Sequence, residues 1–66
     1  METLAALEEL LSIHRVKDMT GLGRTNIYLR MKDKKFPPSI RVGGRALWIR
    51  SEVQQWIRER IEENRN

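Results

Sequence analysis

The sequence IHRVKDMTGLGRTNIYLRM (Ile13–Met31) has apolar residues at helical spacing on both sides of a glycine. It predicts a first helix over Ile13–Thr20 that ends at Gly21, because glycine adopts the left-handed backbone conformation at little cost. Leu22 is expected to enter the core from the turn, and a second helix is expected from about Arg24 to Asp33. This is the spacing of a helix-turn-helix, whose second helix can enter the major groove of DNA.

The second helix is expected to have one buried side and one outward side. Ile27 and Met31 mark the buried side. At about 100° per residue, a different set of side chains points away from the core. That outward set is Thr25, Leu29 and Lys32, with Asn26 and Tyr28 on its shoulders.

A hairpin is predicted after this helix. Pro37 and Pro38 cannot continue a helix, and a proline also restricts the residue before it to extended conformations. Two β-prone arms then flank Gly43–Gly44–Arg45, which is a hairpin signal. The apolar residues of the arms alternate with others, so one face of the ribbon is expected to be apolar. That face comprises Ile40, Val42, Leu47 and Ile49.

The last segment predicts an amphipathic helix. Ser51 followed three residues later by Gln54 fits a capping box at its start. Val53, Trp56, Ile57 and Ile61 then recur at the spacing of one helical face. Trp56 is therefore expected to be the main aromatic residue of the core.

The first residues also favour a helix, over Thr3–Leu11. Leu4, Leu7 and Leu11 share one face of it. A helix this short is marginal alone, so it must pack on its own domain or on a second copy. Ser12 either ends this helix or caps the next one, and a single continuous helix over 3–20 is an alternative.

These elements fit one small domain over 1–66, mostly α with a small β-hairpin, in a winged helix-turn-helix plan. Its parts are an N-terminal helical extension (1–12), the helix-turn-helix (13–33), a hairpin wing (39–49) and a C-terminal helix (51–63). The chain has no cysteine and a lone histidine, His14, so no disulfide, metal site or cofactor is expected. No apolar run approaches the roughly 20 residues of a membrane span, and no signal peptide is visible, so a cytoplasmic setting is expected.

Positive charge is concentrated in the middle of the chain. The net charge is +4, but ten basic and two acidic residues lie between His14 and Arg50. The two ends are net acidic. A basic centre of this kind suits a polyanion such as nucleic acid, although a basic solvated surface is the alternative.

Catalysis is not indicated. One histidine and scattered carboxylates offer no nucleophile and base pair. Gly21–Leu22–Gly23 lacks the preceding strand and third glycine of a phosphate loop. We therefore expect a binding protein and no enzyme.

Double-stranded DNA is the expected partner, and the start of the second helix supplies the candidate base contacts. Arg24 can pair with guanine, Asn26 with adenine or a phosphate, and Thr25 can touch a thymine methyl or donate from its hydroxyl. Tyr28 has a phenol that can reach a phosphate, or is a half-buried residue at the core edge. Further cations are candidates for phosphate or minor-groove contacts, with ordinary solubility as the alternative for the lysines. They are Lys32, Lys34, Lys35, Arg41 and Arg45.

Two stretches together resemble one family. They are TGLGRTNIY (Thr20–Tyr28) and KFPPSIRVGGRALWIRSEVQQWI (Lys35–Ile57). The chain is similar over about residues 12–61 to the AlpA family of small phage and prophage regulators, within the excisionase and MerR-like winged-helix group. The resemblance implies sequence-specific DNA binding and regulation of prophage or genomic-island genes.

The chain departs from that family in three places. Gly23 stands where serine is common, and Leu29 and Arg30 reverse the usual order of a basic and an apolar residue. The leucine-rich residues 2–11 extend beyond the usual start, and they are a candidate homodimer contact through Leu4, Leu7 and Leu11. An excisionase-type factor that bends attachment-site DNA is the nearest alternative function. A protein-interaction module is an alternative of another class.

Overall fold

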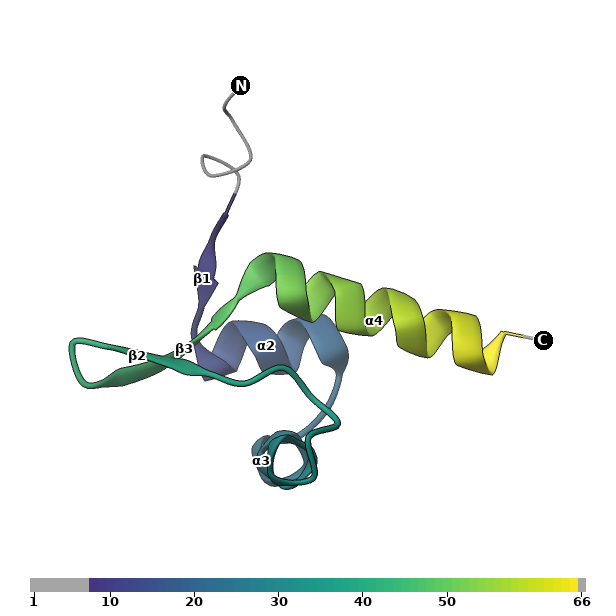
Figure 1. Cartoon of the computed structure of the whole chain (residues 1–66), viewed down its shortest axis with the longest axis horizontal. Coiled ribbons are helices and arrows are strands. Elements are labelled where there is room, and N and C mark those ends of the chain that lie inside the picture. Colours follow the sequence, from purple (N-terminus) through teal and green to yellow (C-terminus); the bar gives the residue numbers. More distant parts are fainter. Residues whose placement is uncertain (1–7, 66) are drawn as a thin grey trace.

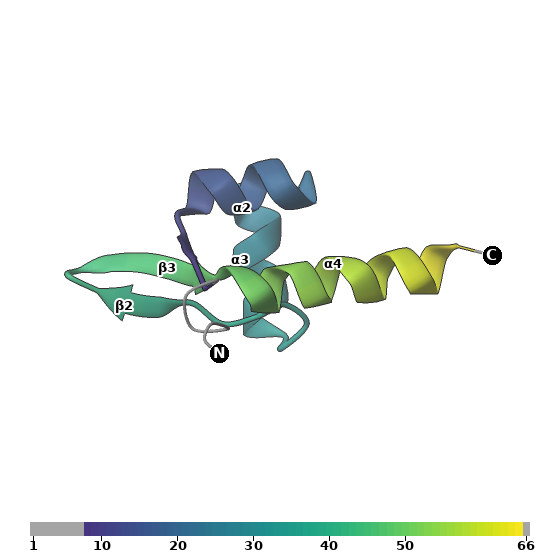
Figure 2. The same cartoon turned by 90° about the horizontal axis from the view of Figure 1, so that it is seen from above.

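A computed structural model describes residues 8–65 of the chain. Three helices and three short strands follow one another closely (Figure 1). They are β1 (Leu10–Leu11), α2 (Ile13–Thr20), α3 (Arg24–Lys32), β2 (Ile40–Val42), β3 (Arg45–Ile49) and α4 (Arg50–Asn64). The hairpin and α4 extend in opposite directions, and α3 runs across α2 and α4 (Figure 2). This arrangement confirms the predicted winged helix-turn-helix.

The helix-turn-helix is held by local contacts. The Ser12 hydroxyl accepts a hydrogen bond from the Arg15 amide at 3.4 Å and so caps α2. Gly21 ends the helix with φ 76°, as predicted, and its amide donates to the Lys17 carbonyl. The Thr20 hydroxyl donates to the Val16 carbonyl at 2.8 Å and accepts from the Leu22 amide at 3.2 Å. The turn between the two helices is therefore tied at several points, and Leu22 packs against the core as expected.

The end of α3 is a Schellman turn with a lysine at its left-handed position. Lys34 has φ 60°, and its amide donates to the Met31 carbonyl at 3.0 Å. The Lys35 amide donates to the Arg30 carbonyl at 2.7 Å. These two bonds satisfy carbonyls at the helix end and reverse the chain. Phe36, only 5% exposed, enters the core directly after them.

The hairpin has a two-residue turn. Val42 pairs with Arg45, and the residues between them, Gly43 and Gly44, have φ 57° and 81°. Positive φ at both positions is the type I′ geometry that matches the twist of antiparallel strands, and glycine adopts it without a steric penalty. The Arg41 guanidinium donates to the Gly44 carbonyl at 3.1 Å and braces the turn.

β1 adds a third strand on the other edge of β3. The strand order is β1-β3-β2, and Leu11 lies opposite Trp48 while Leu10 lies opposite Ile49. The predicted helix over 3–11 is thus wrong at Leu10–Leu11, and residues 3–20 do not form one helix. The helix propensity of a short segment is a weak preference, and pairing with β3 outweighs it. Thr3, Leu4 and Leu7 lie outside the described residues.

The core contains one tryptophan, and it is not the expected one. Among residues 8–65, five are 0% exposed, namely Leu11, Val16, Ile27, Trp48 and Val53. The expectation that Trp56 is the main core aromatic is wrong, because Trp56 is only partly buried. Its ring packs edge-on against Phe36, with 4.8 Å between the ring centres, and its Nε1 donates to the Lys35 carbonyl at 2.8 Å. Since Leu11 is buried within its own chain, it is not available as a dimer contact.

The apolar face of the hairpin lies on the side away from the helices. Trp48 and Ala46 share the face that packs on the helices. Successive residues of a strand point to opposite sides, so the predicted apolar face is the outer one. Ile40 is 38% exposed and Val42 45%, and Leu10 of β1 is 45% exposed beside them.

α4 begins one residue before the expected position. Its N-cap is Ile49, and the Arg50 amide donates to the Glu9 carbonyl at 2.8 Å. The Ser51 hydroxyl donates instead to the Glu8 carboxylate, whose oxygens are 3.0 and 3.1 Å away. The predicted capping box is therefore wrong, because Ser51 already lies inside the helix and its hydroxyl contacts the segment before β1.

We expect Gly23→Ser to stabilise the fold. Gly23 is the N-cap of α3 with φ −80° and ψ 165°, has no side chain to cap the helix, and has open space where a Cβ would lie. A serine hydroxyl can accept from the first turn, and the unfolded chain loses freedom, so unfolding should need about 0.5–1 kcal/mol more. Thermal unfolding followed by circular dichroism measures this. Gly21→Ser is the contrasting control, since φ 76° there disfavours any side chain, and an equal gain from both variants would contradict the assignment.

Candidate nucleic-acid interface

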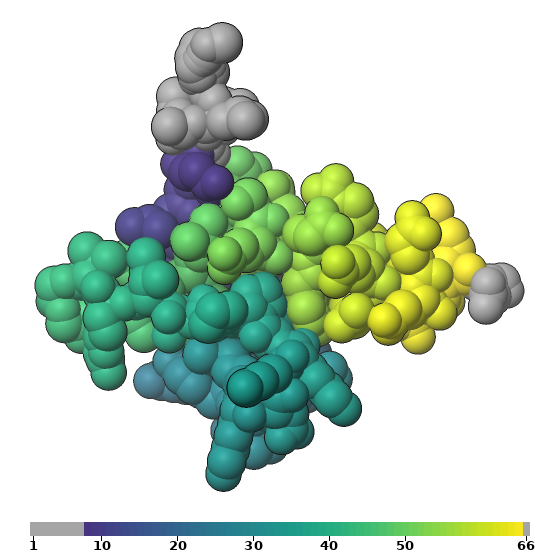
Figure 3. All heavy atoms as spheres, in the orientation of Figure 1, coloured from purple at the N-terminus to yellow at the C-terminus, as the bar shows by residue number. Residues whose placement is uncertain are grey.

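The outward side of α3 is exposed along its length. Thr25, Leu29 and Lys32 are exposed, while Ile27 is fully buried and Met31 half-buried. Leu29 is 59% exposed. Figure 3 shows α3 and the segment after it protruding from the body between the hairpin and α4. The helix is therefore free to approach a partner along its outer face.

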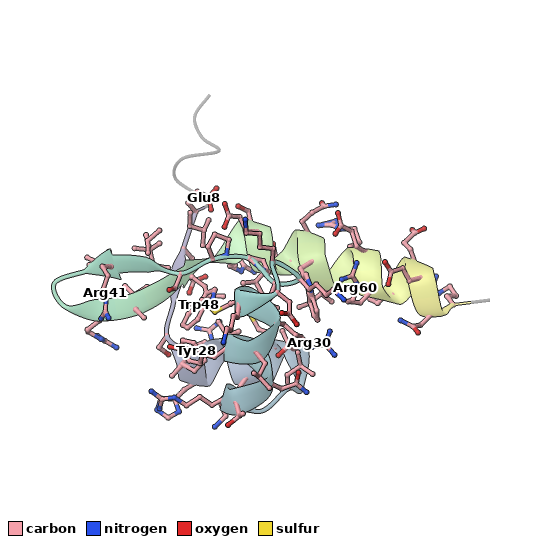
Figure 4. The ribbon with its side chains drawn as sticks, turned by 60° about the horizontal axis from the view of Figure 1, so that its bottom comes forward. Glu8, Tyr28, Arg30, Arg41, Trp48 and Arg60 are labelled. Carbon is pink, nitrogen blue, oxygen red and sulfur yellow. The ribbon has the colours of Figure 1, made fainter. Side chains whose placement is uncertain are left out.

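The shoulder of α3 toward the hairpin is a stack of three side chains. The Arg24 guanidinium lies 5.9 Å from the centre of the Tyr28 ring. That ring meets the Trp48 ring edge-on, with 5.9 Å between the ring centres and 72° between the ring planes (Figure 4). Because Trp48 is part of the core, it fixes Tyr28, and Tyr28 supports the Arg24 side chain. Tyr28 thus lies at the core edge and still exposes 37% of its surface.

The opposite shoulder is organised by Arg30. Its Nε donates to the side-chain amide oxygen (Oδ1) of Asn26 at 2.8 Å, and its guanidinium lies 6.0 Å from the centre of the Trp56 ring on α4. Asn26 is thereby oriented with its amide nitrogen free of any hydrogen bond within the described residues. Arg30 was not among the predicted site residues. The spacing of four residues between Asn26 and Arg30 is the signal that could have identified it.

The two wing arginines lie on different faces of the hairpin. Arg41 pairs with Ala46 and so shares the face that packs on the helices, whereas Arg45 lies opposite Val42 on the outer face. Both are exposed. Arg41 is therefore the wing cation on the side of α3 (Figure 4). Arg45, near the tip, points away from that side.

Lys32 and Lys35 lie at and just after the C-terminal end of α3. Both are exposed, near the end of α3, and the bond from Trp56 to the Lys35 carbonyl holds the backbone there. The structure thus does not gather the predicted residues into one cluster. It spreads them along α3 with cations at either flank.

Acidic side chains do not neutralise these cations within residues 8–65. The salt bridges join Glu9 to Arg15 and Arg50, and Glu59 and Glu63 to Arg60. None involves a cation of α3, of the hairpin or of the segment between them. An unneutralised positive surface attracts a polyanion over some distance and is screened by salt.

Other kinds of site are not found in the described part of the chain. No three histidine, aspartate or glutamate side chains there come together as metal ligands. No helix among the same residues is both long and apolar enough to cross a membrane. The hollow between α3 and α4 is open and lined by both signs of charge, including Arg30, Arg60 and Glu59.

Comparison with known proteins gives two matches. A family model described as prophage CP4-57 regulatory protein (AlpA) matches residues 9–61. An uncharacterized protein, ORF88 of Enterobacteria phage P4, is 36% identical over 55 residues. That alignment covers 82% of this chain and 62% of the phage protein, so the chain spans less than two thirds of its relative's length. No solved structure gives a significant match.

Proposed function

The chain belongs to the AlpA family of prophage regulatory proteins, as its sequence resemblance predicted, and from this membership we propose that it regulates transcription by binding a specific double-stranded DNA site. The genes concerned are those of a phage, a prophage or a genomic island. The observation that supports this most is the outward face of α3. It is exposed, begins with residues able to read bases, and carries cations that no described carboxylate pairs with.

In this proposal α3 enters the major groove, which is about 12 Å wide and admits a helix. Arg24 pairs with guanine, and Asn26 and Thr25 contact neighbouring base edges. The Tyr28 hydroxyl, which has no hydrogen bond within residues 8–65, donates to a phosphate. Lys32 and Lys35 contact the backbone near the C-terminal end of the helix, and Arg41 contacts it from the hairpin.

A salt titration tests whether DNA is the partner at all. We expect the logarithm of the association constant for a random-sequence duplex to fall linearly with the logarithm of salt concentration. Fluorescence anisotropy with a labelled duplex, from about 50 to 300 mM salt, measures it. An affinity that does not change with salt would contradict the proposal and favour a protein-interaction module.

Lys35→Ala is expected to weaken binding to all duplexes alike and to reduce the salt slope by about one. Arg58→Ala is the matched control. Arg58 is an exposed cation on α4, beside Ile57 and Met19 and on the far side of that helix from Trp56. The Arg58→Ala substitution removes the same charge and should leave the salt dependence of binding unchanged. Equal effects from both variants would mean that net charge alone, and no particular surface, attracts DNA.

A further inference from the structure

Leu29 is an apolar side chain at the centre of the polar face of α3. At 59%, it is the most exposed large apolar side chain among residues 8–65. At about 100° per residue it lies opposite the midpoint between Ile27 and Met31, the two residues that face the core. The solvent side of a surface helix is ordinarily polar, and Leu29 is the apolar residue at the centre of that side.

The surroundings of Leu29 are polar and held in place. Thr25 lies one turn before it on the same outward side. The Arg24–Tyr28 stack lies on one shoulder and the Asn26–Arg30 hydrogen bond on the other. Leu29 therefore lies at the middle of the face that the proposed function turns toward the groove.

We propose that Leu29 contacts the methyl group of a thymine in the major groove and so selects an A·T pair at the centre of the site. This rests on the proposed DNA-binding function. The thymine C5-methyl is the one apolar group that base pairs present in that groove. A leucine against any other edge would remove water from donors and acceptors without replacing their hydrogen bonds. The contact therefore both attracts thymine and disfavours a G·C pair.

Replacing thymine by deoxyuridine tests the contact, because it removes the methyl group and keeps every hydrogen-bonding atom. Bound duplexes are first selected from a random pool, and each thymine of the selected site is then replaced in turn. At one central position we expect the parent protein to bind about 4-fold more weakly, the effect of exposing one methyl-sized group. Leu29→Ala should bind the thymine and deoxyuridine duplexes equally well. The exposed position makes alanine compatible with folding.

Two control variants identify the residue responsible. Ile61→Ala removes another exposed apolar side chain, on α4, and should keep the discrimination between the two bases. Thr25→Ser removes the other methyl group near the groove. If Thr25→Ser abolishes the discrimination and Leu29→Ala does not, the assignment to Leu29 is overturned.

The remaining outcomes separate this inference from the proposed function. A selected site that tolerates deoxyuridine at every position would overturn the Leu29 contact and leave DNA binding intact. Failure to enrich any site from the pool would overturn sequence-specific binding, and the Leu29 contact with it.

Discussion

Replacing Trp48 with alanine is expected to remove a large part of the stability of the fold. Trp48 is 0% exposed and lies opposite Leu11 in the sheet, and it also supports Tyr28. Removing a buried tryptophan costs about 3–5 kcal/mol. A 66-residue domain has a total stability of only about 3–10 kcal/mol, so between about a third of it and all of it would be lost. Urea unfolding followed by far-ultraviolet circular dichroism measures the change.

Two further variants show whether the loss of stability depends on the position of the tryptophan or on the residue type. Trp56→Ala should lower stability less, because Trp56 is only partly buried and loses mainly its contact with Phe36 and its bond to Lys35. Trp48→Phe should still fold. The buried Trp48 Nε1 has no hydrogen-bond partner within the described residues, so its removal breaks no such bond. A larger loss from Trp56→Ala than from Trp48→Ala would show that the core is misassigned.

Arg24→Ala is expected to have the largest effect on recognition. It should weaken binding to the selected site by about 1–3 kcal/mol, or about 5- to 150-fold in Kd, because a bidentate contact to guanine is lost. Binding to a random duplex should weaken much less. Anisotropy titrations with both duplexes at one salt concentration measure the difference.

Tyr28 gives this prediction its controls. Tyr28→Phe keeps the ring beneath Arg24 and should preserve specificity, losing at most one phosphate contact. Tyr28→Ala removes the support of Arg24 and should reproduce part of the Arg24→Ala effect. If Arg24→Ala weakens both duplexes equally, Arg24 contacts the backbone and α3 does not read bases through it.

Elements controlled by neighbouring residues were predicted correctly. Gly21 ends α2, the two prolines follow α3, and Gly43–Gly44 form the hairpin turn, because each sets its own backbone angles. The faces of α3 were also predictable, since one helical period relates Ile27 to Leu29 whatever surrounds the helix. The positions of the candidate site residues on that helix follow from the same periodicity.

Elements controlled by distant residues were predicted wrongly or left undecided. Leu10–Leu11 becomes a strand only because β3 lies alongside it, and Ser51 contacts Glu8 for the same reason. The alternation within the hairpin divides its residues into two faces, but it does not say which face meets the helices. The packing of the helices on one face decides this, so Trp48 is buried while Ile40 and Val42 are exposed.

The sequence by itself thus determined the helix-turn-helix, the wing and the outward face of α3, because backbone preferences and periodicity act within a few residues. The tertiary structure alone decided which tryptophan forms the core, that Arg41 rather than Arg45 lies on the side of α3, and that Trp48 and Trp56 lie against Tyr28 and Arg30. These depend on strand register and on packing between segments far apart in the chain. No local pattern specifies such contacts, because their free energy arises only when both partners are in place.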